Sequence, residues 1–115
     1  VWAETFKYVA DNNVKFDRML LKPSMVAPGA DCTKKSNAKE VAAYTLKMLN
    51  SRVPPETAGI MFLSGGLSEL DSTMYLNAMN QQPNPWHVSF SYARALQNSV
   101  RIFFCERLVT RLRSV

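Results

Sequence analysis

The sequence predicts an α/β fold built on a parallel β-sheet, and three observations support that prediction. Residues 59–63 (GIMFL) form a continuous apolar run without alternation, which is typical of a strand buried on both faces of a parallel sheet. Longer segments whose apolar residues recur at helical spacing lie between the short apolar segments. The resulting order is a helix followed by three strand–helix pairs, the pattern from which parallel sheets are built.

The first part of the chain is predicted to form a helix and a strand. Residues 1–13 carry apolar side chains at positions i, i+4 and i+7, namely Trp2, Phe6 and Val9. Residues 18–22 (RMLLK) form a predicted strand that ends at Lys22, directly before Pro23.

A second helix is expected after a loop that contains Pro28 and Gly29. Ser36 or Asn37 can cap its N-terminus, and the helix is predicted to end near residue 50. Its inward stripe is predicted to consist of Val41, Tyr44, Met48 and Leu49.

The second half of the chain repeats the strand–helix pattern. The apolar run 59–63 is followed by the motif SGG at 64–66 and a predicted helix over 68–80. A third strand is predicted over 87–91, and a final helix begins near Tyr92 and continues toward the C-terminus. Three strands cannot close a barrel and leave bare sheet edges, so we expect these units to form part of a larger sheet.

Composition excludes several classes of protein. The 115 residues are 47% hydrophobic and 20% charged, as in globular proteins. Cys32 and Cys105 match no metal-binding spacing, and with a single histidine no metal site is predicted. The net charge of +5 is concentrated in the tail, where four arginines and one glutamate follow Val100. We therefore do not predict a nucleic-acid-binding domain.

Polar or glycine-rich residues stand at the end of each predicted strand. Lys22 ends the first strand, Ser64, Gly65 and Gly66 follow the second, and Ser91 ends the third. The carboxyl ends of parallel strands share one rim of the sheet, where α/β proteins bind their ligands. Consecutive N–H groups in a glycine turn can bind an anion, although such a turn is more often only a tight connection.

Arg94 falls in the first turn of the last predicted helix, where cations are usually disfavoured. Alone it would be interpreted as solvated; beside the other strand ends it is better explained by a bound phosphate. The loops after the last two strands of a TIM barrel commonly bind phosphate. The three strands would then be the sixth, seventh and eighth of such a barrel.

Lys22 has two interpretations. It can be a solvated charge at the end of a strand, or an amine held among apolar neighbours that desolvate it. A neutral amine attacks a carbonyl carbon and forms an imine, or Schiff base. A lysine beside a phosphate site would imply a phosphorylated ketone or aldehyde as substrate.

The motifs LLKPSMV, VPPETAGIMFLSGG and LNAMNQQPNPWHVSFSYARALQNSV, with the spacings between them, resemble class I fructose-bisphosphate aldolases. The stretch PNPWHVSFSYARALQN is most similar to the plant plastid form. The resemblance implies a TIM (βα)8 barrel, of which this chain carries only the last three βα units. It further implies reversible cleavage of fructose 1,6-bisphosphate to dihydroxyacetone phosphate and glyceraldehyde 3-phosphate, with no metal or other cofactor, in glycolysis, gluconeogenesis or the Calvin cycle.

The matching motifs carry site residues over from the family. Lys22 takes the place of the Schiff-base lysine. Ser64, Gly65 and Gly66 match one part of the phosphate-binding site, and Ser91 with Arg94 matches the other. The family's proton-transfer residues lie on earlier strands, so this chain alone is expected to be very slow.

The sequence departs from the family pattern in several places. Arg18 stands where a glycine usually precedes LLKP, Leu67 replaces a glutamine, Ala93 replaces a frequent glycine, and VPPETAG differs at its centre. Residues 1–100 are expected to form the C-terminal portion of the aldolase barrel. Residues 101–115 (RIFFCERLVTRLRSV) match nothing in the family and are expected to form a divergent basic tail.

The resemblance also implies partners and a compartment. The expected partner is a phosphorylated sugar substrate, the full-length family forms homotetramers, and neither nucleic acid nor a membrane is expected. The expected location is the chloroplast stroma, with the cytoplasm second. One alternative is a truncated, non-catalytic form that binds full-length aldolase subunits, and another is a small basic nucleic-acid-binding domain.

Overall fold

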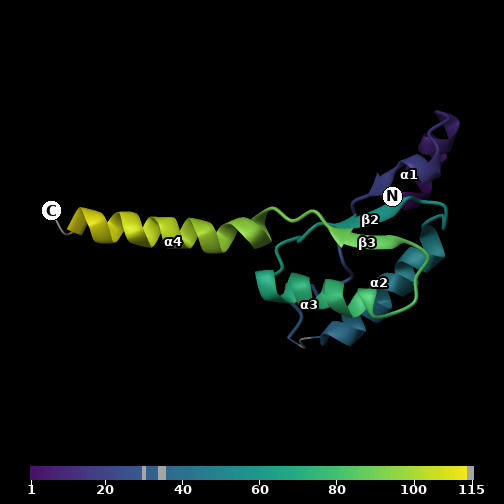
Figure 1. The fold of residues 1–115 in the computed structure, drawn as a ribbon. Coiled ribbons are helices and arrows are strands. Elements are labelled where there is room, and N and C mark those ends of the chain that lie inside the picture. The colour runs from purple at the N-terminus through teal and green to yellow at the C-terminus, as the bar shows by residue number, and fades with distance from the viewer. Residues whose placement is uncertain (30, 34–35, 114–115) are drawn as a thin grey trace.

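Three parallel strands form the centre of the fold (Figure 1). The computed structural model describes residues 1–29, 31–33 and 36–113. The strands are adjacent in chain order: β1 (Leu20–Leu21), β2 (Gly59–Phe62) and β3 (His87–Phe90). The register aligns Leu20 with Gly59 and Gly59 with His87, so the three strands begin level with one another. The predicted parallel α/β arrangement is therefore confirmed.

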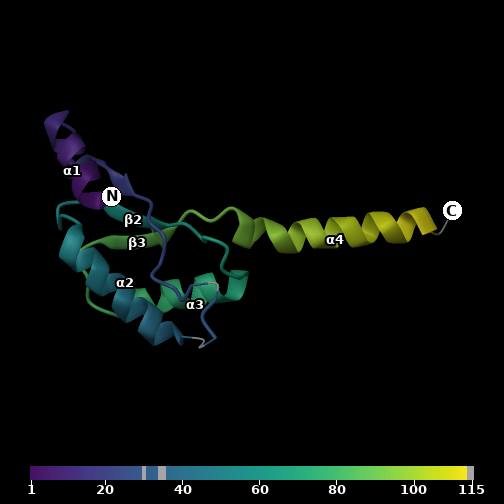
Figure 2. The ribbon, with the colours of Figure 1, turned by 180° about the vertical axis from the view of Figure 1, so that it is seen from behind.

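The helices α2 and α3 lie side by side against one face of the sheet (Figures 1 and 2). The last helix, α4, extends away from this body, and the molecule measures 62 × 34 × 26 Å along its principal axes. The helices are α1 (Trp2–Asp11), α2 (Ala38–Arg52), α3 (Glu69–Asn80) and α4 (Arg94–Arg113).

The core lies between the sheet and these two helices. Ile60 and Phe62 of β2 are fully buried, and Val88 of β3 lies beside them. Leu49 of α2 and Met79 of α3 pack against the same cluster. Burial of these apolar side chains is the main free-energy gain that holds α2 and α3 on the sheet.

Side-chain caps determine where α2 and α3 begin. Asn37, one of the two predicted caps, accepts a hydrogen bond from the Glu40 N–H at 2.9 Å, and its own N–H donates to the Glu40 carboxylate at 3.1 Å. Ser68 accepts from the Asp71 N–H at 3.0 Å. Each cap satisfies a backbone donor that the first helical turn leaves unpaired.

The first strand is shorter than the predicted 18–22. Phe16–Arg18 form a 3-10 turn, and the Met19 N–H bonds back to the Phe16 carbonyl at 3.3 Å. At the other end, Pro23 has no N–H to continue the ladder. Only Leu20 and Leu21 therefore pair as a regular strand.

The predicted inward stripe of α2 was partly wrong. Val41 and Leu49 are buried as expected, but Tyr44 is 62% exposed. Ala42, Thr45 and Leu46 are buried instead. The small Ala42 and the polar Thr45 weaken the apolar pattern, although both lie on the face that packs against the body.

The final helix begins at Arg94, two residues later than predicted, and runs without interruption past residue 100. Ala95 is buried at its start, and each side chain from Leu96 to Arg107 is exposed. The helix thus runs through the expected boundary between residues 100 and 101.

Shortening a side chain should have very different effects on stability on the two faces of α2. Leu49→Ala should lower the free energy of unfolding by about 2–5 kcal/mol, because it opens a cavity in the core. Tyr44→Ala, on the same helix, should change it by about 0.5 kcal/mol or less. Urea unfolding followed by circular dichroism measures both, and equal losses would mean that Tyr44 is buried in solution.

Candidate functional site

The predicted site residues lie beyond the carboxyl ends of the three strands. β2 and β3 pair through to Phe62 and Phe90, and the Ser91 N–H continues the ladder by donating to the Phe62 carbonyl at 2.9 Å. On the other side, the Leu63 N–H donates to the Pro23 carbonyl at 3.0 Å. These two hydrogen bonds hold the residues after all three strands at one edge of the sheet.

Lys22 directly follows β1, and its side chain is exposed. Leu21 packs against the core, so strand alternation places Leu20 and Lys22 on the opposite face of the sheet, the open face. Leu20 there is 59% exposed. The same register places Met61 and Ser89 level with Lys22 on the open face. The predicted apolar surroundings of the amine are therefore only partly present in this chain.

The segment Ser64–Leu67 forms a tight turn. The Leu67 N–H donates to the Ser64 carbonyl at 2.9 Å. Gly65 and Gly66 have φ angles of +58° and +89°, in the left-handed region that glycine adopts without steric cost. Their N–H groups have no hydrogen-bond partner among the described residues. The turn thus leaves two adjacent donors available for an anion.

This turn lines a hollow of about 280 Å³ together with the loop after β1. Ser24, Met25, Ala27 and Pro28 form one wall, and Ser64 to Leu67 form the other. The Val26 N–H donates to the buried Thr45 hydroxyl of α2 at 3.0 Å, which fixes the loop over the sheet edge. The wall formed by the loop after β1 was not predicted from the sequence, although Ser24 directly follows Lys22 and Pro23.

Ser91 and Arg94 lie on the far side of the same edge. Arg94 is the first residue of α4, within the first turn as predicted, and both side chains are exposed. Neither they nor Lys22 line the 280 Å³ hollow. The structure thus joins the glycine turn to the loop after Lys22, and leaves Ser91 and Arg94 beside them rather than in the same hollow.

Tyr92 is a positioning residue that the sequence did not reveal. Its hydroxyl donates to the Ser72 carbonyl of α3 at 2.8 Å, and the centroid of its ring lies 5.0 Å from that of Phe90. Burial raises the pKa of the Tyr92 phenol, and the Ser72 side chain partly offsets this rise. The bond holds the segment between Ser91 and Arg94 against α3.

Over the described ranges, no group of three or more His, Cys, Asp or Glu side chains is arranged to hold a metal ion. Among the same residues, no helix is both long enough and apolar enough to cross a bilayer.

Comparison with known proteins gives consistent matches. A family model described as fructose-bisphosphate aldolase class-I matches residues 1–105. The chloroplastic fructose-bisphosphate aldolase 1 of Chlamydomonas reinhardtii is 72% identical over 100 residues, which are 87% of this chain and 26% of that protein. The chloroplastic aldolase 1 of Arabidopsis thaliana is 67% identical over 99 residues, which are 86% of this chain and 25% of that protein.

A solved structure supports the same likeness. Fructose-bisphosphate aldolase from Plasmodium falciparum, crystallised with TRAP and a small molecule inhibitor, superposes with a TM-score of 0.80 at 43% identity. The match covers 86% of this chain and 29% of that one. The chain thus spans about a quarter of the length of the curated relatives it matches.

Substitution of a glycine in the 64–67 turn should lower the stability of the fold. Gly65→Ala places a Cβ 3.1 Å from Leu63 Cδ1 at a φ of +58°, so we expect a loss of about 1–2 kcal/mol in unfolding free energy. Gly29→Ala is the control, because a Cβ there meets nothing within 4 Å. Thermal or urea unfolding compares the two. Equal stability of the two variants would contradict the left-handed turn.

Burial of the Tyr92 phenol should make the free energy of unfolding depend on pH. A raised pKa in the folded state means that this contribution to stability is complete below the unfolded pKa of about 10 and is lost as pH rises through the folded value. The free energy of unfolding should therefore fall less steeply between about pH 9.5 and 11 in Tyr92→Phe than in the unsubstituted chain. Urea unfolding across that range tests this, and parallel profiles would contradict it.

Proposed function

The chain belongs to the class-I fructose-bisphosphate aldolase family, and we propose that its three βα units are the last three of an eight-stranded TIM barrel. The three consecutive parallel strands, with α2 and α3 on one face, support this assignment. In such a barrel the helices lie outside, so the open face that carries Lys22 would line the interior. The strands missing here would cover Leu20 and pair with the outer edges of β1 and β3.

The proposed activity is reversible cleavage of fructose 1,6-bisphosphate to dihydroxyacetone phosphate and glyceraldehyde 3-phosphate. The observation that carries it is the placement of Lys22, the 64–66 turn and Ser91 at one edge of a parallel sheet in a chain 72% identical to an aldolase. The sugar phosphate is the proposed substrate, and glycolysis, gluconeogenesis and the Calvin cycle are the pathways in which this reaction would serve.

Lys22 is the proposed nucleophile. Its neutral Nζ would add to the ketone carbon of the substrate, water would leave, and a C=N bond would form. The protonated imine then accepts the electron pair of the bond between the α and β carbons, the second bond from the imine carbon, as that bond breaks. The aldehyde product leaves as the substrate hydroxyl loses its proton to a base on an earlier strand of the barrel. Protonation of the remaining enamine and hydrolysis of the imine would release the ketone and restore the amine.

The phosphate group is proposed to bind in two parts. Ser64 and the free N–H groups of Gly65 and Gly66 would hold it from one side, since adjacent backbone donors favour an anion. Ser91 and the Arg94 guanidinium would hold it from the other, and a guanidinium can bind two phosphate oxygens at once. Ala93 keeps the N–H that a glycine would supply there.

Residues 1–100 would be the barrel portion and 101–115 a divergent basic tail; the curated matches cover 99 or 100 residues, and the family model reaches residue 105. The relatives are named chloroplastic, which supports a plastid location. A homotetramer is the assembly proposed for complete barrels of the family. The comparisons do not favour a non-catalytic partner of full-length subunits as the main role.

A chimera tests the catalytic proposal. Residues 1–100 would replace the matching 100-residue segment of the Chlamydomonas aldolase, so that the barrel is complete. We expect the chimera to cleave fructose 1,6-bisphosphate, and borohydride with dihydroxyacetone phosphate to leave a reduced adduct on Lys22, located by mass spectrometry. Lys22→Arg should lower kcat by about 10³-fold or more, because a guanidinium cannot form the imine.

The matched control is Lys39→Arg, on the exposed side of α2, which should keep the activity of the chimera. An adduct on another lysine with Lys22 unmodified would overturn the assignment of the nucleophile. An inactive chimera beside an active parent enzyme would overturn the assignment of residues 1–100.

A further inference from the structure

The helix α4 carries an apolar stripe that no described residue covers. Leu96, Val100, Phe103 and Phe104 follow one another at i, i+4, i+7 and i+8, so they lie on one side of the helix. All four are exposed, Phe104 by 61%. Two neighbouring phenylalanines on a solvent-facing helix are a costly arrangement, which indicates that a protein surface covers them.

The helix α4 cannot pack this stripe against the sheet and the other helices of its own chain. Ala95 is buried and the Ser99 hydroxyl donates to the Glu69 carboxylate, which fixes the start of α4 beside the start of α3. From there α4 runs straight outward (Figures 1 and 2). At about 1.5 Å per residue, Phe104 lies roughly 15 Å beyond Arg94.

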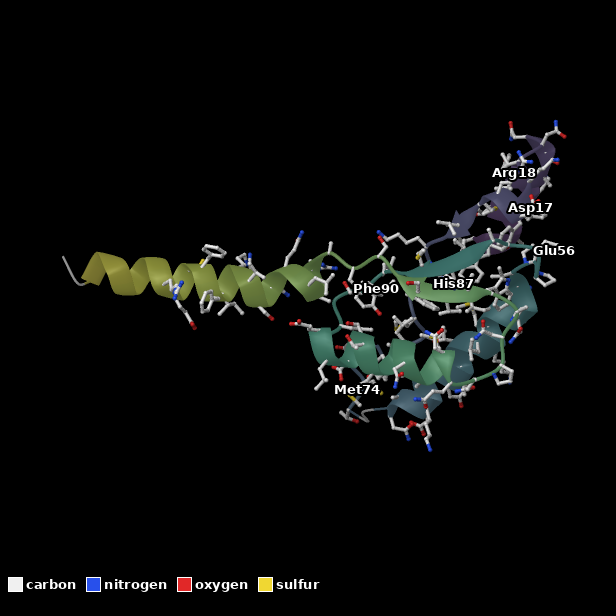
Figure 3. The ribbon with its side chains drawn as sticks, viewed as in Figure 1. Asp17, Arg18, Glu56, Met74, His87 and Phe90 are labelled. Atoms are coloured by element: carbon white, nitrogen blue, oxygen red, sulfur yellow. The ribbon has the colours of Figure 1, made fainter. Side chains whose placement is uncertain are left out.

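The outer side of α3 offers a matching surface. Leu70 is 67% exposed, and Met74 follows it at i+4 on the side turned away from the sheet (Figure 3). Glu69 and Asp71 flank Leu70, and α3 has no basic residue. This surface is therefore a short apolar stripe with a net charge of −2.

Charge complementarity favours α3 of a second copy over its α4 as the partner of the stripe. Between residues 94 and 107, three arginines and one glutamate give α4 a net charge of +2. Pairing two copies of α4 would therefore bring like charges together, whereas α4 on α3 joins opposite charges. The Arg107 guanidinium lies 4.9 Å from the Phe103 ring, so whatever buries Phe103 also meets a cation. The carboxylates of α3 suit that position better than lipid tails do.

We infer that this chain dimerises by docking α4 of each copy on α3 of the other. The contact is reciprocal, as a two-fold axis requires, with the α4 stripe on Leu70 and Met74 and its arginines near Glu69 and Asp71. The inference depends on the surfaces of α3 and α4 and not on aldolase activity.

The test is the molar mass of the purified full chain under reducing conditions, by light scattering and sedimentation over a concentration series. Reduction excludes a disulfide through the exposed Cys105. We expect a dimer. Phe103→Glu and Leu70→Lys should each weaken dimerisation at least about tenfold, since each places a charge in the apolar contact. Tyr44→Glu, at an exposed aromatic of α2, should leave the dimer intact.

Mixing the two weakened variants distinguishes this arrangement from others. Phe103→Glu keeps an intact α3, and Leu70→Lys keeps an intact α4, so their mixture should recover a heterodimer with one of the two contacts. A dimer that Leu70→Lys leaves intact would mean pairing through α4 alone. A monomer at all concentrations, or a monomer that sediments with anionic vesicles in a Phe103-dependent manner, would overturn the inference.

Discussion

The pairing of β2 with β3 is the interaction on which the rest of the structure depends. It aligns Gly59–Phe62 with His87–Phe90 residue for residue and buries Ile60, Phe62 and Val88 under α2 and α3. Because β2 lies between β1 and β3, backbone groups at its C-terminal end also position the residues that follow the other two strands. The Leu63 N–H holds Pro23 and the Phe62 carbonyl holds Ser91, so one strand positions the residues that follow all three. No other contact is needed to bring Lys22 to the same edge of the sheet as the glycine turn.

The sequence predicted the three strands, the four helices and the polar strand ends, because runs such as GIMFL and turns such as SGG are local signals. It failed where a contact between distant segments decides the structure. Thr45 is buried because it accepts the Val26 N–H, and Tyr44 is exposed because α2 turns its 42–45–49 side inward. The hollow between the β1 loop and the 64–67 turn and the Tyr92–Ser72 bond likewise join distant segments.

The departures from the family pattern have different structural consequences. Arg18 projects into solvent at the end of the 3-10 turn, beside Asp17, and the strand begins after it (Figure 3). Leu67 packs against the core and lines the hollow, so an apolar side chain lies there where the family pattern has a glutamine. Glu56 is exposed, while Thr57 is buried with no partner for its hydroxyl among the described residues. A buried unpaired hydroxyl lowers stability, so the change at VPPETAG is the one with a structural cost.

The order of the strands in the sheet is the same as their order in the chain. Among the described residues, each strand therefore pairs with the strand that precedes or follows it, across a single helical connection. Closing such connections costs little chain entropy compared with joining remote segments, because the cost grows with the length of the loop. Topologies made of near-neighbour pairings fold faster than those that wait for distant strands. We therefore expect the edge of the sheet that carries Lys22 to form early in folding, once the three strands have paired.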